Sequence, residues 1–375
     1  MTINNYEELS QSIEQNGVEA TMDAVQATVS QAYASGLMSK TFDKSPRVHK
    51  AINWNRPTNA YNQTFHDKNI EQMWTHTEYI PSKDRNVWDR LDPAIQEVYK
   101  KVLGGLTLLD TKQATIGMPL ISQVVEDLHQ KVVLSFMGMM ETIHALSYST
   151  IFTTLLTDTE TDEVFDWVEE NPYLQFKAEH ITHYYENITD SKSLYLAMVA
   201  SVFLESFLFY SGFFLPLWLA GGGLEGKAKM VASGEIINKI IADESIHGVY
   251  VGLLAQEEYK KLTVEEQKEV DYEVEALMKE LMENEIKYTE DLYAPIGLDH
   301  EVKNYLIYNA NKAMMNLGKT PIYEEKKINP IVENGLSTET KTHDFFSTKG
   351  AGYILAKHRA LTDADFEFVI DTEWD

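Results

Sequence analysis

The chain has 375 residues and no cysteine. It therefore forms no disulfide, no thiolate zinc site and no iron–sulfur cluster through its own side chains, and it has no thiol nucleophile. If the reaction involves thiols, another polypeptide must supply them. A cysteine-free composition suits a reducing compartment, and the first residues lack the basic start and apolar core of a signal peptide. We therefore expect a cytoplasmic protein.

Basic residues are scarce beside acidic ones. The chain has 32 Lys and Arg against 58 Asp and Glu, a net charge of −26, which argues against nucleic acid as a partner. Convincing strand periodicity is also absent, because no segment alternates apolar and polar residues as a half-buried strand does. With 44 % hydrophobic residues, the composition predicts an all-α protein with a large packed core.

Only one stretch is long and apolar enough to suggest a membrane span, residues 194–220. Glu205 lies near its middle, and burying that carboxylate in lipid would cost roughly 2.5–3.5 kcal/mol. A helix enclosed on all sides by a large bundle explains the same composition. We therefore expect no membrane association, and we expect Glu205 to have a metal ion or a polar partner.

The pattern along the chain predicts three parts. Residues 1–40 read as a polar, amphipathic helical extension, and residues 41–318 as the main helical domain. Residues 319–375 lose helical periodicity and become polar and acidic, which is typical of a flexible tail.

Several helix boundaries have clear signals. Asp92-Pro93 predicts an N-cap and first-turn proline for a helix that runs to about Ile116. Thr263 opens a capping box. Asp299 is predicted to cap a last helix that stops at Gly318.

The pattern Glu141-Thr-Ile-His144-Ala-Leu-Ser-Tyr148 has spacings of three and seven residues. On an α-helix these three polar side chains share one face. A second Glu-x-x-His pair, Glu244 and His247, lies in a separate segment. Two such pairs on separate helices are what a carboxylate-bridged dinuclear metal site requires.

Two further carboxylates, Asp110 and Glu205, lie in apolar helical segments, where an unpaired acid is unusual. The predicted ligand set is thus four carboxylates and two imidazoles: Asp110, Glu141, His144, Glu205, Glu244 and His247. Such ligands suit iron or manganese, and four carboxylates nearly balance two divalent ions. One Glu-x-x-His alone is usually an accident of a helix surface, but two inside apolar helices are not.

Other histidines are less suited to a site. His180 and His183 lie in a polar segment beside two tyrosines, so a surface role is the better interpretation. From the residues alone, a dinuclear centre leaves open a stand-alone oxygenase, a ferroxidase, a metal-storage protein or a structural bundle. Tyr148, one turn beyond His144, favours a centre that oxidises a tyrosine.

Together these motifs resemble the radical-generating small (beta) subunit of class I ribonucleotide reductase, most closely its class Ib branch. The resemblance covers roughly residues 48–368. It rests on the segments Leu106–Thr111, Glu141–Tyr148, Phe203–Phe213, Asp243–His247, Lys287–Tyr293, Tyr308–Lys312 and His343–Phe346.

The resemblance implies roles for individual residues. Tyr148 corresponds to the tyrosine that holds the stable radical. The residues matching the apolar pocket around it are Phe209, Phe213 and Ile240. The residues matching the radical-transfer route are Trp74, Asp243 and, in the tail, Tyr353.

The resemblance also implies a fold, cofactors and partners. The expected fold is an all-α, ferritin-like helical bundle that houses two manganese or two iron ions. The expected partners are a second copy of the chain, a large (alpha) catalytic subunit that reduces ribonucleotides, and a flavodoxin-like activator. Residues 365–368 match the end of the tail that anchors on the large subunit. This chain departs from the family in its longer N-terminus and in the residues after Phe368.

Overall fold

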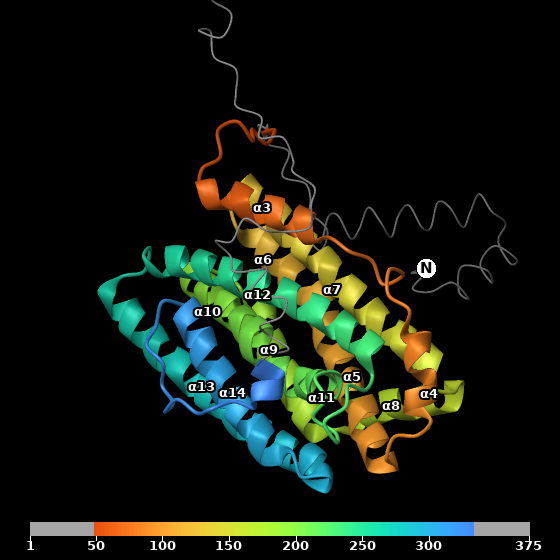
Figure 1. The fold of residues 1–375 in the computed structure, drawn as a ribbon. Helices are drawn as coiled ribbons and strands as arrows, with labels where there is room; N and C mark the ends of the chain where they lie inside the picture. Colours follow the sequence, from red (N-terminus) through yellow and green to blue (C-terminus); the bar gives the residue numbers. More distant parts are fainter. Residues whose placement is uncertain (1–48, 334–375) are drawn as a thin grey trace, which may run out of the picture. The chain divides into compact units, whose positions relative to one another are not determined.

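The computed structural model describes residues 49–333, and Figure 1 shows that they form helices joined by short loops. Residues 1–40 and the greater part of the predicted tail, including Tyr353, lie outside the described residues. Between residues 49 and 333 no strand occurs, so the prediction of an all-α fold is confirmed.

Helices of four to thirty residues succeed one another along the described chain. The α-helices are α3 (Ala60–Gln72), α4 (Arg85–Trp88), α5 (Pro93–Lys112), α6 (Met118–Val124), α7 (Leu128–Leu155), α8 (Asp158–Glu170), α9 (Pro172–Glu186), α10 (Ser191–Phe203), α11 (Tyr210–Ala220), α12 (Val231–Tyr259), α13 (Val264–Tyr293) and α14 (Asp299–Asn316). Short 3₁₀ segments are η1 (Pro81–Asp84) and η4 (Ala294–Ile296), and π-helical segments are η2 (Gln113–Gly117) and η3 (Leu204–Leu208).

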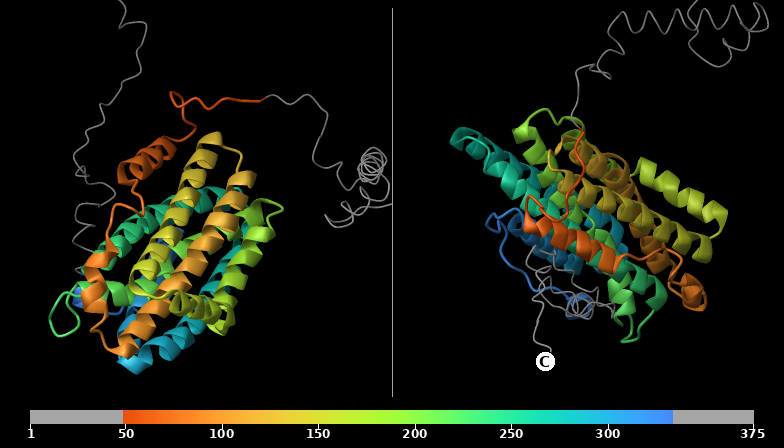
Figure 2. Two further views of the ribbon diagram at one scale, coloured as in Figure 1. Left: turned by 90° about the vertical axis from the view of Figure 1, so that its right-hand side faces the viewer. Right: turned by 90° about the horizontal axis from the view of Figure 1, so that it is seen from above.

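Four of these helices form the centre of the bundle. Helix α5 packs against α7, α10 packs against α12, and α7 also contacts α12. The left view of Figure 2 shows α5 and α7, orange and yellow, running side by side. Helices α13 and α14 pack against α10 and η3, while α8 and α9 pack against α5. Further helices therefore cover most of the central bundle, and α7 keeps one exposed face.

Local capping explains several helix ends. Asp92 accepts a hydrogen bond from the backbone of Ala94 at the start of α5, as predicted. Thr263 and Glu266 form the predicted capping box of α13. The prediction for Asp299 is wrong: it is the first residue of α14, and Leu298 occupies the N-cap without a side-chain hydrogen bond.

Two π-helical segments interrupt helices that the sequence pattern shows as continuous. The helix predicted to run to Ile116 has α-helical geometry only as far as Lys112. It then continues as the π-helical segment η2. The apolar stretch of residues 194–220 contains η3, and Glu205 is its second residue. A π turn adds a residue to a helical turn and keeps the helix continuous, so no helix-stop signal marks where it begins. For this reason the pattern did not predict either segment.

The apolar stretch lies in the interior of the described bundle. Residues 191–220 form one helical run, long and apolar enough to cross a membrane, and the most apolar window of that run is completely buried within the protein. Its composition is thus explained as that of a core helix, as predicted. Glu205 is buried with it.

Packed structure continues past the boundary predicted at residue 318. The side-chain amide of Asn311 donates to the Tyr323 carbonyl at 2.9 Å, and the Tyr323 backbone amide donates back to the Asn311 side-chain oxygen at 3.1 Å. Val332 is fully buried. At the other end, α3 begins at Ala60, and the Asn59 side chain caps it by accepting a hydrogen bond from the backbone of Tyr61.

Candidate metal centre

Three of the central helices, together with η3 at the end of α10, contribute carboxylate or imidazole groups to one interior cluster. Asp110 comes from the last turn of α5, and Glu205 from η3. Helices α7 and α12 each contribute a Glu-x-x-His pair. All six predicted ligands are completely buried: Asp110, Glu141, His144, Glu205, Glu244 and His247.

Their donor atoms fall into two overlapping groups. Asp110 and His144 complete one group, and Glu205 and His247 complete the other; Glu141 and Glu244 belong to both. Within each group the potential ligand atoms lie within 4.8 Å of one another. Two adjoining sites that share two carboxylates are the arrangement of a carboxylate-bridged dinuclear centre in a ferritin-like bundle.

Both imidazoles turn the same nitrogen toward the cluster. His144 Nδ1 lies 3.0 Å from Glu244 Oε1, 3.2 Å from Asp110 Oδ1 and 3.4 Å from Glu141 Oε2. His247 Nδ1 lies 2.7 Å from Glu141 Oε1 and 3.1 Å from Glu244 Oε2. Glu141 and Glu244 thus each approach both histidines.

The cluster fits a pair of cations. Although these groups lie near one another, both oxygens of Asp110 and Glu141, one oxygen each of Glu205 and Glu244, and Nδ1 of His144 make no hydrogen bond of acceptable geometry within the described chain. Leaving such buried groups without a partner is costly, and two divalent ions would satisfy them and neutralise four carboxylates. Oxygen-rich ligands with two imidazoles suit iron or manganese.

Burial and neighbouring charges shift the pKa values of these groups. Burial, followed by the neighbouring carboxylates, raises the pKa of Glu205 well above its usual value. Burial is also the main cause that raises the pKa of Asp110. For His144, burial disfavours the charged ring, but Glu244 and the other carboxylates outweigh it and hold its pKa well above the usual range.

A hydrogen-bonded chain leads from the cluster to Trp74. The Nε2 atom of His144 lies 3.0 Å from Asp243 Oδ2, and the indole nitrogen of Trp74 donates to the same oxygen at 2.8 Å. The rings of Trp74 and His144 are nearly parallel, at 20°, with centroids 6.0 Å apart. Trp74 and Asp243, which are 169 positions apart in the sequence, are thus directly hydrogen-bonded.

Tyr148 lies one turn beyond His144 on α7 and is completely buried. Its hydroxyl has no hydrogen-bond partner within residues 49–333. Burial, followed by the charge of Asp110, raises its pKa well above the usual value of a phenol. The residues expected to shield it are also completely buried: Phe209, Phe213 and Ile240.

The predicted surface histidines are separate from this cluster. His180, on α9, makes contacts of 2.9 Å with the Phe176 carbonyl and 3.3 Å with Glu280, and its ring stacks on Phe176. Neither His180 nor His183 belongs to a metal-ligand group within the described residues. Tyr353 and residues 365–368 lie outside the part that the structure describes.

One residue beside the cluster was not predicted. Gln113, the first residue of η2, is completely buried and donates a hydrogen bond to Glu205. A signal was present, because Gln113 is a polar residue one turn after Asp110 in an apolar helix. Its partner could not be read from the sequence, since the two residues lie on different helices.

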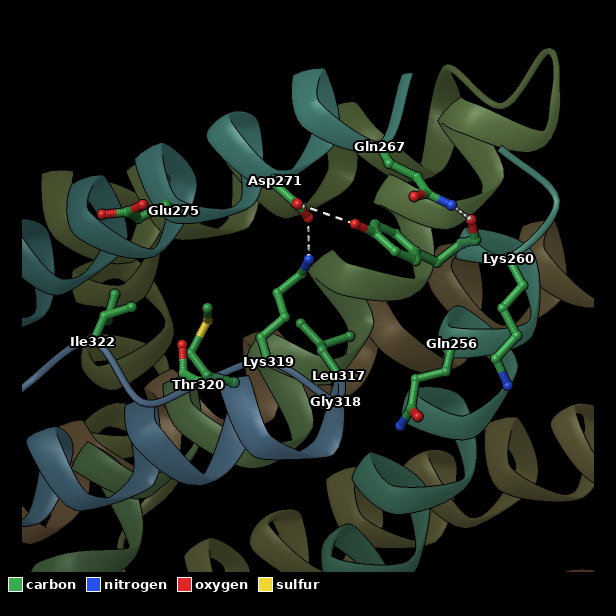
Figure 3. Close-up of a pocket in the computed structure, with 12 residues that line it drawn as sticks. Gln256, Lys260, Gln267, Asp271, Glu275, Leu317, Gly318, Lys319, Thr320 and Ile322 are labelled. Atoms are coloured by element: carbon green, nitrogen blue, oxygen red, sulfur yellow. Dashed lines mark hydrogen bonds and ion pairs between the residues drawn. The ribbon is translucent and has the colours of Figure 1, made fainter. Parts of the chain in front are cut away.

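A surface depression of about 580 Å³ lies where the end of α12 meets α13 and the segment after α14. Figure 3 shows Lys319 directed at Asp271, which also accepts a hydrogen bond from the Tyr259 hydroxyl at 3.0 Å. Gln256 lines the depression and donates to the Asn316 carbonyl at 2.9 Å, and the Asn316 side chain donates to Ser206 Oγ at 3.0 Å. A polar chain thus connects this surface with the residue next to Glu205.

Comparisons with known proteins agree with this geometry. A family described as "Ribonucleotide reductase, small chain" matches residues 51–330. The "Ribonucleoside-diphosphate reductase subunit beta" of Bacillus subtilis (strain 168) is 50 % identical over 330 residues, which cover 87 % of this chain and 99 % of that protein. The protein of the same name from Bacillus phage SPbeta is 50 % identical over 325 residues, which cover 86 % of this chain and 97 % of that protein.

A solved structure is similar over most of its length. The dimanganese(II)-NrdF of Streptococcus sanguinis is 43 % identical to this chain and superposes with a TM-score of 0.73. The match covers 77 % of this chain and all of that chain. Likeness at this level of identity extends to the fold and to the helices that carry the cluster.

Proposed function

The chain belongs to the ribonucleotide reductase small-chain family, and from this premise we propose that its buried centre generates and stores a radical on Tyr148. As a small (beta) subunit of ribonucleoside-diphosphate reductase, it serves the reduction of ribonucleotides to deoxyribonucleotides by a large catalytic subunit. The observation that carries the proposal is the position of Tyr148, fully buried and one turn beyond a ligand of a dinuclear cluster.

The six clustered residues would hold two ions. Asp110 and His144 would bind one ion, Glu205 and His247 would bind the other, and Glu141 and Glu244 would bridge them. Two manganese or two iron ions, when bound and oxidised by an external oxidant, would accept the electron that Tyr148 loses together with its hydroxyl proton. The ligand set suits both metals, and the dimanganese form of the Streptococcus sanguinis relative favours manganese.

The surroundings of Tyr148 suit the storage of a radical. Because its pKa is raised by burial, the phenol is protonated until it is oxidised. No part of its side chain is exposed to water. Since a tyrosyl radical is destroyed by reductants that reach it, a fully buried position among apolar side chains extends its lifetime.

We propose that the radical leaves the centre through His144, Asp243 and Trp74. Asp243 accepts hydrogen bonds from both rings at one oxygen, which holds them in a fixed relation. From Trp74 the route would continue to Tyr353 in the tail, and residues 365–368 would anchor that tail on the large subunit. These two assignments rest on the family motif alone.

A flavodoxin-like protein is the proposed activator for manganese. The depression beside Lys319 and the chain Gln256–Asn316–Ser206 offer a polar route for a small oxidant toward Glu205. Gly248 leaves room for Ser206, because a Cβ at that position would collide with the Ser206 hydroxyl. Iron should react with dioxygen directly. A full radical yield from manganese and air alone would contradict the need for an activator.

The protein is also proposed to act as a homodimer, in the cytoplasm. The exposed side of helix α7 forms an outward strip that includes Met139 and Leu146. Between Val132 and Leu156 this strip carries no charged residue. In a chain of net charge −26, an uncharged strip on a long helix is suited to self-association.

The experiment that tests the proposed function separates the radical from the fold. Metal-loaded, activated protein should show a tyrosyl radical by electron paramagnetic resonance, and Tyr148→Phe should bind metal, remain folded and lose the signal. Tyr305→Phe is a matched control, because Tyr305 is also fully buried with an unpaired hydroxyl. Reductase activity in Tyr148→Phe would refute the proposal.

A second variant tests use of the radical rather than its formation. Tyr353→Phe should form the Tyr148 radical normally but support no nucleotide reduction with the large subunit. Deleting residues 360–375 should leave the radical intact and weaken binding to the large subunit. If Tyr353→Phe turns over like the parent, the assignment of that tyrosine is wrong.

A further inference from the structure

Gln113 is a neutral polar side chain enclosed beside the cluster. It occupies the first position of the π-helical segment η2, three residues after Asp110, and no part of it reaches solvent. A buried amide must find partners for one acceptor and two donor positions. The three hydrogen bonds of Gln113 therefore identify the side chains that it orients.

All three bonds are present. The amide nitrogen donates to Ser201 Oγ at 2.8 Å and to Glu205 Oε1. The amide oxygen accepts from the Tyr185 hydroxyl at 2.7 Å. The opposite orientation of the amide would direct its oxygen at Glu205, which is unfavourable when that carboxylate is ionised, as a metal ligand is, so the nitrogen faces Glu205. Tyr185 supports this orientation by donating to the other end.

The two residues come from the two π-helical segments of the bundle. Gln113 begins η2, and Glu205 is the second residue of η3. Such segments occur frequently at functional sites, because they move one side chain out of the regular helical register. At Gly117, also in η2, a Cβ would lie 2.7 Å from a ring carbon of Tyr185. The glycine therefore provides the space in which Tyr185 meets Gln113.

Gln113 leaves the two oxygens of Glu205 unequal. Oε1 is bonded to the amide, whereas Oε2 has no hydrogen-bond partner in the described chain and lies 3.7 Å from His247 Nδ1. Because the amide occupies one lone pair of Oε1 and fixes its direction, turning both oxygens equally toward one ion would strain the bond to Gln113. The Gln113 amide thus determines which oxygen of Glu205 is free to face a metal ion.

We propose that Gln113 is a positioning residue of the centre, which reserves Oε1 of Glu205 and leaves Oε2 alone to bind a metal ion. The proposal rests on the proposed dinuclear site. Because Gln113 carries no charge, it orients Glu205 without altering the balance of four carboxylates against two divalent ions. Outer residues of this kind typically change metal affinity by about 10- to 100-fold when replaced.

The test compares manganese binding in the parent, Gln113→Met and Tyr185→Phe. Methionine keeps the length of the side chain but cannot donate, so the ion held by Glu205 and His247 should bind about 10- to 100-fold more weakly. Tyr185→Phe removes only the hydroxyl that orients the amide and should give a smaller loss. Asn284→Leu is the control, because it removes a buried amide that bonds the Tyr173 carbonyl instead.

Three measurements distinguish positioning from general damage. Thermal unfolding of the metal-free proteins should show that the variants fold, titration with manganese(II) should give stoichiometry and affinity, and the paramagnetic resonance spectrum of the loaded pair should change in Gln113→Met but not in Asn284→Leu. A crystal structure of loaded Gln113→Met should show both oxygens of Glu205 on one ion.

The failure of this inference differs from failure of the proposed function. If the parent binds two ions and Gln113→Met matches it in affinity, spectrum and Glu205 geometry, Gln113 has no positioning role. If the parent itself does not bind two ions, the dinuclear site is refuted, and the role of Gln113 with it.

Discussion

His144 shows how one side chain can serve two purposes in the same interior. Its Nδ1 faces three carboxylates of the cluster, and its Nε2 faces Asp243. Asp243 in turn holds Trp74 through the same oxygen. The position and tautomer of a ligand histidine are commonly set by such an outer partner. The residue that binds the cluster is therefore also the first member of the proposed transfer route.

Asp243→Asn should weaken this arrangement without unfolding the protein. The amide oxygen of asparagine can still accept from both rings, but it is uncharged and therefore a weaker acceptor, and the amide nitrogen adds a donor in place of the second carboxylate oxygen. We expect nucleotide reduction to fall by about 10- to 100-fold while the Tyr148 radical still forms. Radical content and turnover should be measured on the same samples. An equal loss of both would mean that Asp243 supports the centre rather than the transfer of the radical.

A second buried charge lies away from the cluster. Lys177, on α9, forms an ion pair with Glu285, on α13, and its Nζ lies 4.1 Å from the ring centroid of Tyr288. Both charged residues are almost completely buried. Burial lowers the pKa of Lys177 from its usual value, against the effect of Glu285. The pair joins two outer helices of the bundle.

Lys177→Met should be strongly destabilising, by about 3–5 kcal/mol, because it leaves the carboxylate of Glu285 buried without a counter-charge. The double variant Lys177→Met with Glu285→Leu should recover most of this loss, since neither charge then remains. Urea unfolding of the three proteins measures the difference. If the double variant is no more stable than the single variant, the loss comes from packing and not from the unpaired charge.

At the scale of elements, α12 depends on another part of the chain for its first turn. Its N-cap, Met230, has a left-handed backbone (φ 55°) and supplies no side-chain hydrogen bond. Asp84 of η1 supplies it instead, accepting from the backbone of Ala232 at 3.2 Å and of Ser233 at 2.7 Å. Because α12 carries Asp243 and two of the six clustered residues, Glu244 and His247, this contact anchors a helix of the candidate metal centre.

Asp84→Ala should therefore lower the free energy of unfolding by about 1–2 kcal/mol, the upper part of the range for lost caps, since the freed backbone donors are buried. Asp92→Ala, which removes a cap of α5 at an exposed position, should cost less. Thermal or urea unfolding compares the two. Equal losses would show that burial adds nothing to the contribution of Asp84.

At the scale of the whole molecule, charged residues are distributed unequally over the surfaces of helices α13 and α7. Helix α13 is rich in exposed acids and in ion pairs such as Glu275 with Lys279 and Glu283 with Lys287. The outward strip of α7 instead presents serine, threonine, Met139 and Leu146. Acidic surfaces of separate molecules repel one another, so self-association is expected through α7.

Leu146→Glu should convert the dimer to a monomer or weaken it about 100-fold or more, because a two-fold interface would bring two added charges together at a cost of several kcal/mol. Sedimentation velocity measures the change. Tyr272→Glu is the control, since Tyr272 is the most exposed of the large hydrophobic side chains described and lies on α13. A parent protein that is monomeric at micromolar concentration would contradict the proposal.

Features that depend on neighbours along the chain were predictable. The spacing of Glu141 and His144 places both on one helical face whatever the rest of the fold does. The caps at Asp92 and Thr263 are formed by residues within one turn of them. The composition of residues 194–220 was sufficient to predict a buried helix. The shared face and the caps depend on residues within one or two turns, and the buried helix depends on the composition of its own segment, so the sequence carries each of them directly.

Features that depend on which helices meet were decided only by the tertiary structure. The bonds of Asp243 to Trp74, of Asp84 to the start of α12 and of Gln113 to Glu205 join residues 92 to 169 positions apart. No local pattern specifies them, because a buried polar group takes the partner that packing brings within reach. The sequence by itself thus determined which residues share a helical face, and tertiary packing decided which faces meet, since only a folded interior removes water as the competing partner.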